Sequence, residues 1–168
     1  LKNKNVYGTS GPRILLWFDL INSPKGQIPM GSKITMSQNP RFIVRAAGSF
    51  KQNEGCSNES IDSLSSERLE YLCAGECYNP SNEREVIEKI EIIKITPQIY
   101  AGEAVSPLIQ DPWKTIPCQG TGECIVEFKD QNFSRDSVYY VRALQNSTPA
   151  INGSSLSQRE SFKLCRGS

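Results

Sequence analysis

The residues best suited to chemistry in this chain are its cysteines, because it has six of them and no histidine. Their spacing contains no C-x-x-C pair, which favours disulfide bonds over a zinc site. We therefore predict that all six are oxidised and that the chain comes from an oxidising location: secreted, periplasmic or extracellular. The six are Cys56, Cys73, Cys77, Cys118, Cys124 and Cys165.

The pairing of these cysteines is open, since six cysteines allow 15 pairings. Cys118 and Cys124 flank a short glycine-containing loop just before an alternating segment, where a bridge would fix the start of a hairpin. Cys73 and Cys77 are close enough in sequence to bond to each other. Each of them could equally pair with Cys56 or Cys165.

The lack of histidine excludes Ser-His and Cys-His nucleophilic catalysis in this chain. Metal-dependent hydrolases typically combine histidine with carboxylates, and only scattered acids are available here. The sequence thus predicts no catalytic residue, no metal site and no cofactor in this chain. The loop acids considered are Asp111, Glu123, Asp130 and Asp136.

Two other features could bind a ligand. Thr9–Arg13 reads Thr-Ser-Gly-Pro-Arg, in which glycine permits close backbone approach and arginine can grip a phosphate with two hydrogen bonds. Ser10, Gly11 and Arg13 are therefore candidate phosphate contacts, although such residues also form ordinary turns before strands. Aromatic rings in irregular segments could stack on sugars or serve as packed anchors. These aromatics are Trp113, Tyr100 and Tyr78.

Five segments have the apolar runs or the alternation of β-strands. Lys33–Met36 is a weaker, sixth candidate, and the five are Arg13–Ile21, Arg41–Ala47, Val86–Ile95, Cys124–Lys129 and Ser137–Leu144. The last has the strongest signal, because it is rich in tyrosine and β-branched residues and lacks proline and glycine. We predict that it is a central strand.

Residues 48–82 are polar and contain three of the six cysteines, with one short helix expected over Ser66–Leu72. We interpret this stretch as a long insertion held by disulfides. The fold class predicted is mainly β: an antiparallel β-sandwich with a disulfide-stapled insertion, in a single domain over residues 1–168.

Net charge and hydropathy argue against two kinds of partner, nucleic acid and the membrane interior. The net charge of +1 provides no field to attract a phosphate backbone, so we expect no nucleic acid partner. No run approaches the roughly 20 apolar residues of a spanning helix, so we expect no membrane span.

Several segments resemble a secreted bacterial family related to the PHP (polymerase and histidinol phosphatase) metallohydrolases. Val6–Ile14, VYGTSGPRI, is similar to the VYATSGPRI segment that closes the catalytic domain of that family. The resemblance extends to about Gly153 and weakens through the cysteine-rich stretch. The other matching segments are Asp111–Lys114, the loop from Cys118 to Cys124, Arg135–Gln145 and Thr148–Gly153.

In that family the metal ligands precede the TSGPR segment, which implies that this chain is a non-catalytic carboxy-terminal accessory domain. A phosphoesterase activity and its divalent metal would belong to an amino-terminal catalytic-type domain, which is the expected partner. The surface around Tyr7, Ile14 and Leu16 should then carry exposed apolar area, and the isolated chain should self-associate or retain a partner polypeptide. The alternative is a free-standing secreted module that recognises a glycan or a protein.

Overall fold

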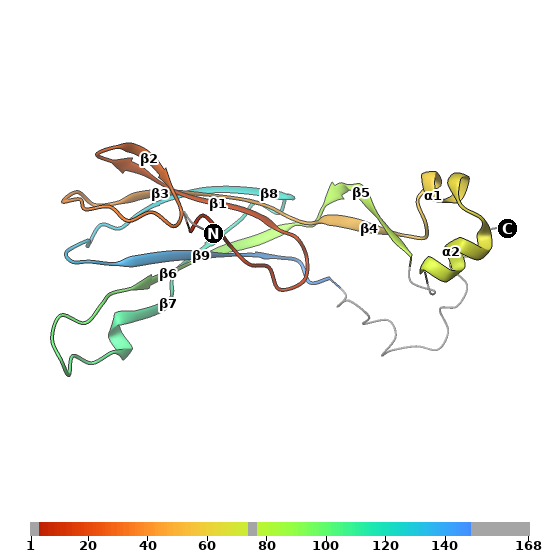
Figure 1. Cartoon of the computed structure of the whole chain (residues 1–168). Helices are drawn as coiled ribbons and strands as arrows, with labels where there is room; N and C mark the ends of the chain where they lie inside the picture. Colours follow the sequence, from red (N-terminus) through yellow and green to blue (C-terminus); the bar gives the residue numbers. More distant parts are fainter. Residues whose placement is uncertain (1–3, 74–76, 149–168) are drawn as a thin grey trace. The chain divides into compact units, whose positions relative to one another are not determined.

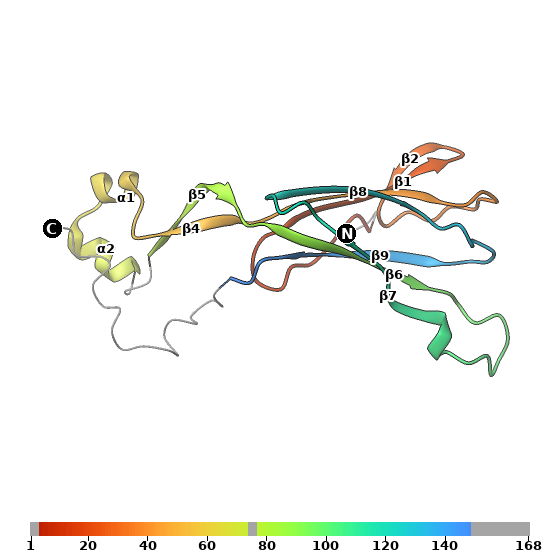
Figure 2. The same cartoon turned by 180° about the vertical axis from the view of Figure 1, so that it is seen from behind.

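The computed structural model describes residues 4–73 and 77–148, and this part of the chain is mainly β (Figures 1 and 2). The five stronger strand candidates fall on strands of the structure and the predicted short helix is present, but the weaker candidate Lys33–Met36 lies in the loop between Pro29 and Arg41 and forms no strand. The elements are β1 (Leu15–Ser23), β2 (Gly26–Pro29), β3 (Arg41–Ala47), β4 (Phe50–Glu54), α1 (Asn58–Ser63), α2 (Ser66–Cys73), β5 (Tyr78–Arg84), β6 (Ile87–Ile95), the 3₁₀ helix η1 (Ser106–Leu108), β7 (Ile109–Pro117), β8 (Glu123–Lys129) and β9 (Val138–Gln145).

Contacts divide the chain into two compact units. Of the described residues, the first unit, called here the sandwich unit, comprises 4–49 and 85–146, and the second, the cysteine unit, comprises 50–73, 77–84 and 147–148. The sequence was interpreted as one domain with an insertion over residues 48–82. The structure groups residues 50–84 as part of a unit of their own.

One sheet of the sandwich unit has the strand order β2-β1-β3-β8, and every neighbouring pair is antiparallel. Strand alternation places Phe18, Val44 and Phe128 on the buried face. The β1–β2 hairpin turns tightly at Gly26, whose φ of 84° suits glycine. The Ser23 hydroxyl supports this turn by accepting a hydrogen bond from the Lys25 amide at 3.1 Å.

The other sheet has the order β7-β6-β9, again antiparallel. Its central strand is β6, which carries four fully buried isoleucines at positions 87, 90, 92 and 93. The prediction that Ser137–Leu144 is a central strand is wrong, because within the described residues β9 is the edge strand of the order β7-β6-β9 and pairs with β6 alone. Tyrosine and β-branched residues favour strands in general, and this preference does not distinguish an edge from a centre.

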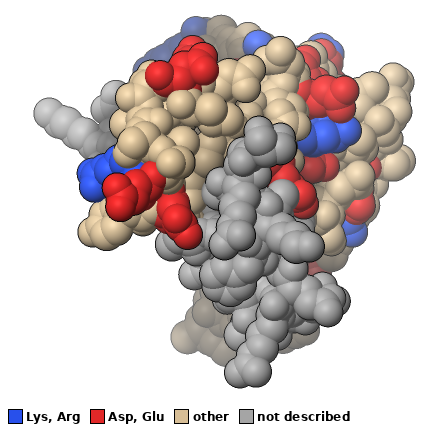
Figure 3. Space-filling view, turned by 90° about the vertical axis from the view of Figure 1, so that its right-hand side faces the viewer, with Lys and Arg blue, Asp and Glu red and all other residues tan. Residues whose placement is uncertain are grey.

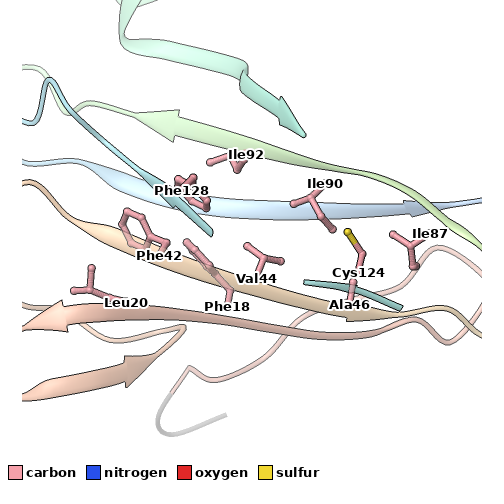
Figure 4. Packing of buried hydrophobic residues seen from close by; sticks show 10 residues of the cluster. All are labelled: Phe18, Leu20, Phe42, Val44, Ala46, Ile87, Ile90, Ile92, Cys124 and Phe128. Atoms are coloured by element: carbon pink, nitrogen blue, oxygen red, sulfur yellow. The ribbon is translucent and has the colours of Figure 1, made fainter. Parts of the chain in front are cut away.

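The hydrophobic core lies between these two sheets. Side chains from β1, β3 and β8 point toward isoleucines of β6 (Figure 4). At one end three aromatic rings pack together: the Phe18–Phe42 pair is tilted with centroids 5.2 Å apart, and the Phe42–Phe128 pair is stacked with centroids 5.0 Å apart. The Cys118–Cys124 disulfide joins the residue after β7 to β8, and thereby links the two sheets covalently. The predicted antiparallel sandwich is confirmed.

The described part of the cysteine unit is built differently. Strands β4 and β5 pair antiparallel, and α1 and α2 lie between them in the sequence. Within residues 50–73 and 77–84, no side chain is fully buried. A unit of this size without a hydrophobic core requires cross-links or another source of stability.

Two backbone segments of the sandwich unit approach each other closely at Gly48 and Glu85, next to the positions where the chain leaves this unit and returns to it. A Cβ atom at Gly48 would lie 2.0 Å from the Glu85 carbonyl oxygen, so only glycine fits. The neighbouring backbone is tied by a hydrogen bond from the Glu85 amide to the Ser49 carbonyl at 2.8 Å. Across residues 4–73 and 77–148, no helix has the length and apolar character needed to cross a membrane.

Candidate functional site

The predicted phosphate-contact segment lies at the surface of the sandwich unit, immediately before β1. Ser10, Gly11 and Arg13 are all exposed, and the φ of Gly11 is 116°, a conformation that suits glycine. The Ile14 amide donates a hydrogen bond to the Pro12 carbonyl at 3.0 Å, which closes the turn. The structure therefore presents these residues to solvent as a turn ahead of a strand.

The most strongly buried ionisable group is Asp130, with 1% of its surface exposed. It directly follows β8, and residues of the opposite sheet form an ion pair and hydrogen bonds with its carboxylate. The Lys94 ammonium of β6 and the Tyr139 hydroxyl of β9 each donate to its Oδ2 atom at 2.5 Å. The Asn132 amide donates to Oδ1 at 3.0 Å. We call Lys94, Asp130 and Tyr139 the inter-sheet polar cluster.

The surroundings of Asp130 and Tyr139 shift the pKa values of both groups. Burial acts to raise the pKa of Asp130, but the hydrogen bonds from Lys94 and Tyr139 outweigh it and hold that pKa below its ordinary value. Burial, together with the hydrogen bond to Asp130, raises the pKa of the Tyr139 phenol. The Asp130 carboxylate is thus ionised and the Tyr139 phenol keeps its proton, and the cluster acts as a structural clamp between the sheets.

Trp113 is packed against this cluster and is not a free platform for a sugar. Its ring lies 6.2 Å from Phe128 and 6.0 Å from Tyr139, centroid to centroid. The ammonium groups of Lys94 and Lys114 lie 5.4 and 4.3 Å from its ring centroid. Of the aromatics considered for stacking, Trp113 is therefore a packed anchor.

The other two aromatics, Tyr100 and Tyr78, are both exposed. Tyr100 lies in the loop before η1 of the sandwich unit, and 62% of its surface is exposed. Tyr78 begins β5 in the cysteine unit and is also exposed.

Three cysteine sulfurs meet in the cysteine unit. Cys73 and Cys77 form a disulfide, and the Cys56 sulfur lies 2.6 Å from that of Cys77 and 3.0 Å from that of Cys73. All three sulfurs lie within 4.8 Å of one another, so in the reduced state they could hold a soft metal ion. As a disulfide, Cys73 and Cys77 are not thiolate ligands. Cys165 lies outside the described residues, so oxidation of all six cysteines stays a prediction.

Of the four loop acids considered for catalysis, Asp111 and Asp130 lie in ion pairs, whereas Glu123 and Asp136 are exposed. Asp111 binds the Arg142 guanidinium, which also contacts Glu91 at 2.8 Å. Arg135 makes two hydrogen bonds to Glu103, at 2.9 and 3.1 Å. On the face in Figure 3, acidic and basic side chains are interspersed among other residues, as the net charge of +1 would suggest.

The exposed face of the β2-β1-β3-β8 sheet was not identified from the sequence. Trp17 of β1 is paired with Arg45 of β3, and Arg45 is paired with Ile125 of β8, so these three side chains form one row across the sheet. Exposed fractions are 48% for Trp17 and 65% for Ile125. The sequence could have predicted this exposure, because side chains alternate between the two faces of a strand. Trp17 is next to buried Phe18 and Ile125 is next to buried Cys124, so both must point to the outer face.

Ile14 and Leu16 were expected to be exposed with Tyr7, but both pack against the sandwich core. Their neighbours Leu15 and Trp17 are the exposed members of β1, because the strand begins with the opposite side of its alternation facing the core.

No protein family model, no curated protein and no solved structure matches the chain.

Proposed function

We propose that this chain is a non-catalytic carboxy-terminal accessory module of a larger, secreted, PHP-type metal-dependent hydrolase. The observation that carries this proposal is that the buried polar groups of the chain bond to one another. Asp130, Lys94 and Tyr139 saturate one another between the two sheets, and so hold the fold together without facing a substrate. The disulfides are compatible with a periplasmic or extracellular location.

In this proposal the parent protein's divalent metal and phosphoesterase chemistry belong to a domain encoded ahead of Leu1. Arg13 and the exposed Ser10-Gly11 turn lie at the start of the module, where they would reach a phosphate bound in that domain. The guanidinium of Arg13 suits this role because it forms two parallel hydrogen bonds to phosphate oxygens.

The experiment compares hydrolysis of phosphate esters by the joined protein with that by the preceding polypeptide alone. We expect the joined protein to be the better enzyme and Arg13→Ala to raise its KM, with Lys25→Ala, another exposed cation of the same unit, as the control. Identical kinetics with and without the chain would contradict the accessory role.

A free-standing binding module is the second candidate, favoured by the exposed Tyr100 in a surface loop and by Trp17 on an open sheet face. A glycan array distinguishes the two proposals. Specific binding by the isolated chain that is lost on Tyr100→Ala or Trp17→Ala would support the binding module.

A further inference from the structure

We propose that Cys56, Cys73 and Cys77, called here the cysteine triad, form a redox-controlled binding site for a thiophilic divalent metal ion such as Zn²⁺. The reduced triad holds the ion with its three sulfurs, and formation of the Cys73–Cys77 disulfide releases it. This inference concerns the cysteine unit and does not depend on the proposed accessory function.

The sulfurs of the triad come from three separate points of the chain. Cys56 follows β4, Cys73 is the last residue of α2, and Cys77 immediately precedes β5. Cys56 is 17 residues from Cys73 in the sequence, so spacing alone did not indicate a metal site. The antiparallel pairing of Glu54 with Tyr78 brings Cys56 and Cys77 together, and both helices lie beyond this end of the strands (Figure 1).

The three sulfurs are close enough to share one ion. The Sγ atom of Cys56 lies 2.6 Å from that of Cys77 and 3.0 Å from that of Cys73. Zinc–sulfur bonds of about 2.3 Å in a tetrahedron place sulfurs about 3.8 Å apart, so the reduced side chains need to separate by only about 1 Å. All three residues are partly exposed, so an ion can reach them from solvent. The fourth tetrahedral position stays open to another ligand.

Backbone contacts fix the position of Cys56 beside Cys77 in the folded unit. The Gly55 amide donates a hydrogen bond to the Cys77 carbonyl at 2.9 Å, and the Asn79 side-chain amide donates one to the Gly55 carbonyl at 2.9 Å. The φ of Gly55 is 96°, a conformation that suits glycine and turns the chain here. These contacts involve no sulfur, so they are compatible with both the disulfide and the metal-bound form.

The chemistry of sulfur selects the ion and couples its binding to redox state. Thiolates favour Zn²⁺ and similar ions over Mg²⁺ and Ca²⁺, which prefer oxygen ligands. A dithiol reductant transfers two electrons and two protons to the Cys73–Cys77 bond, becomes a disulfide itself and leaves two thiols on the chain. When the three sulfurs then bind the ion, their thiol protons pass to solvent. Reoxidation by a disulfide oxidant removes two of the three ligands and so releases the ion.

A bound ion replaces the cross-link that the cysteine unit loses on reduction. Residues 50–73 and 77–84 have no fully buried side chain, and a unit without a hydrophobic core depends on cross-links or a metal. Binding to a site that exists only in the folded unit adds the free energy of metal binding to that of folding. The same three positions are therefore held by a disulfide when oxidised and by the ion when reduced.

The test uses the whole chain, reduced with a phosphine in oxygen-free and metal-free buffer, and titrated with Co²⁺ and then with Zn²⁺. We expect about one Co²⁺ to bind per chain in tetrahedral, sulfur-rich coordination, seen as intense visible bands and a near-ultraviolet thiolate-to-cobalt absorption. Zn²⁺ should displace the Co²⁺ and remove both signals. The oxidised chain should show neither signal.

Substitutions assign the ligands. Cys56→Ser and Cys77→Ser should each weaken Co²⁺ binding by at least about 100-fold, because loss of an outer-shell contact alone costs about 10–100-fold. The matched control replaces Cys118 and Cys124 together with serine, which removes two thiols from the sandwich unit. It should leave the affinity within about threefold, since these residues share no partner with the triad.

Hydrogen exchange of the unsubstituted chain locates the site even where a variant does not fold. Reduction in metal-free buffer removes the cross-link, and Zn²⁺ added afterwards should restore protection of residues 50–73 and 77–84. Protection of β3 and β6 in the sandwich unit should not change on addition of Zn²⁺, because the core holds these strands.

The inference is overturned by a reduced chain that binds no Co²⁺, by Co²⁺ binding that survives Cys56→Ser, or by Zn²⁺-dependent protection confined to the sandwich unit. Equal Co²⁺ binding by the oxidised chain would contradict the redox control. None of these results bears on the accessory function, which hydrolysis of phosphate esters tests separately.

Discussion

The Lys94 ammonium donates to the Asp130 carboxylate at 2.5 Å, and this contact joins the central strand of one sheet to the end of the edge strand β8 of the other. Both side chains are largely removed from solvent, with exposed fractions of 12% and 1%. A charge buried in this way is tolerated only when it is paired and hydrogen-bonded. The pair therefore fixes how the two sheets face each other at this end of the core.

Loss of the carboxylate should be strongly destabilising. Asp130→Asn leaves the Lys94 ammonium without its counter-charge between the sheets, and we expect the free energy of unfolding to fall by about 3–5 kcal/mol. Glu127→Gln, which removes an exposed partner of Arg41, is the matched control and should change it by less than about 1 kcal/mol. Chemical denaturation of both variants measures the difference, and equal effects would show that the cluster is not a clamp.

The same pair predicts how stability depends on pH. The pKa of Asp130 is lower in the folded chain than its ordinary value of about 4, so its contribution is present above that pH and is lost as the pH falls through the folded pKa. Glu103 behaves alike, because hydrogen bonds from Arg135 and the Ile99 amide lower its pKa. Urea unfolding at pH 6, 5, 4 and 3 should show little loss to pH 5 and a steep loss below pH 4. Asp130→Asn should flatten that loss.

Gly48 should not tolerate any side chain. A Cβ atom would meet the Glu85 carbonyl oxygen, which belongs to the backbone and cannot move aside cheaply. We expect Gly48→Ala to cost about 1–3 kcal/mol of stability. Gly8→Ala is the control, since a Cβ atom there has open space around it. Thermal melts of the two variants side by side decide the matter, and a neutral Gly48→Ala would refute the close approach.

The cysteines should all be oxidised, and the two units should respond differently to reduction. Alkylation without reductant should label no thiol, and mass spectrometry of the digest should find Cys118 linked to Cys124. Reduction should abolish exchange protection of residues 50–73 and 77–84, which have no fully buried side chain, while β3 and β6 stay protected by the core. Protection of the cysteine unit that survives reduction would show that sulfur cross-links do not hold it.

Much of the sandwich was predictable because it follows from alternation. Phe42, Val44 and Ala46 were assigned to one face of their strand, and all three are buried. In β6, Lys94 lies two residues after buried Ile92 and four after buried Ile90, and alternate residues of a strand share a face. The inward position of this cation could therefore have been predicted from the alternation alone. Its acceptor could not, because Asp130 is 36 residues away and the register between sheets is set by packing.

Other features depend on information that a single strand does not contain. The edge position of β9 is decided by which strands pair, not by its own composition. Strands β4 and β5 lack an apolar alternation because neither has a core to face, so the polar stretch gave no strand signal. Ser10, Gly11 and Arg13 were found by residue type, and the structure places them at the surface before β1.

The proposed accessory role requires that this chain by itself hydrolyses no phosphate ester. The most direct measurement is hydrolysis of phosphate monoesters and diesters by the purified, oxidised chain in the presence of Mn²⁺, Mg²⁺ or Zn²⁺. We predict no turnover above the metal-only background under any of these conditions. Turnover that scales with the concentration of the chain and disappears when the chain is unfolded would contradict the claim.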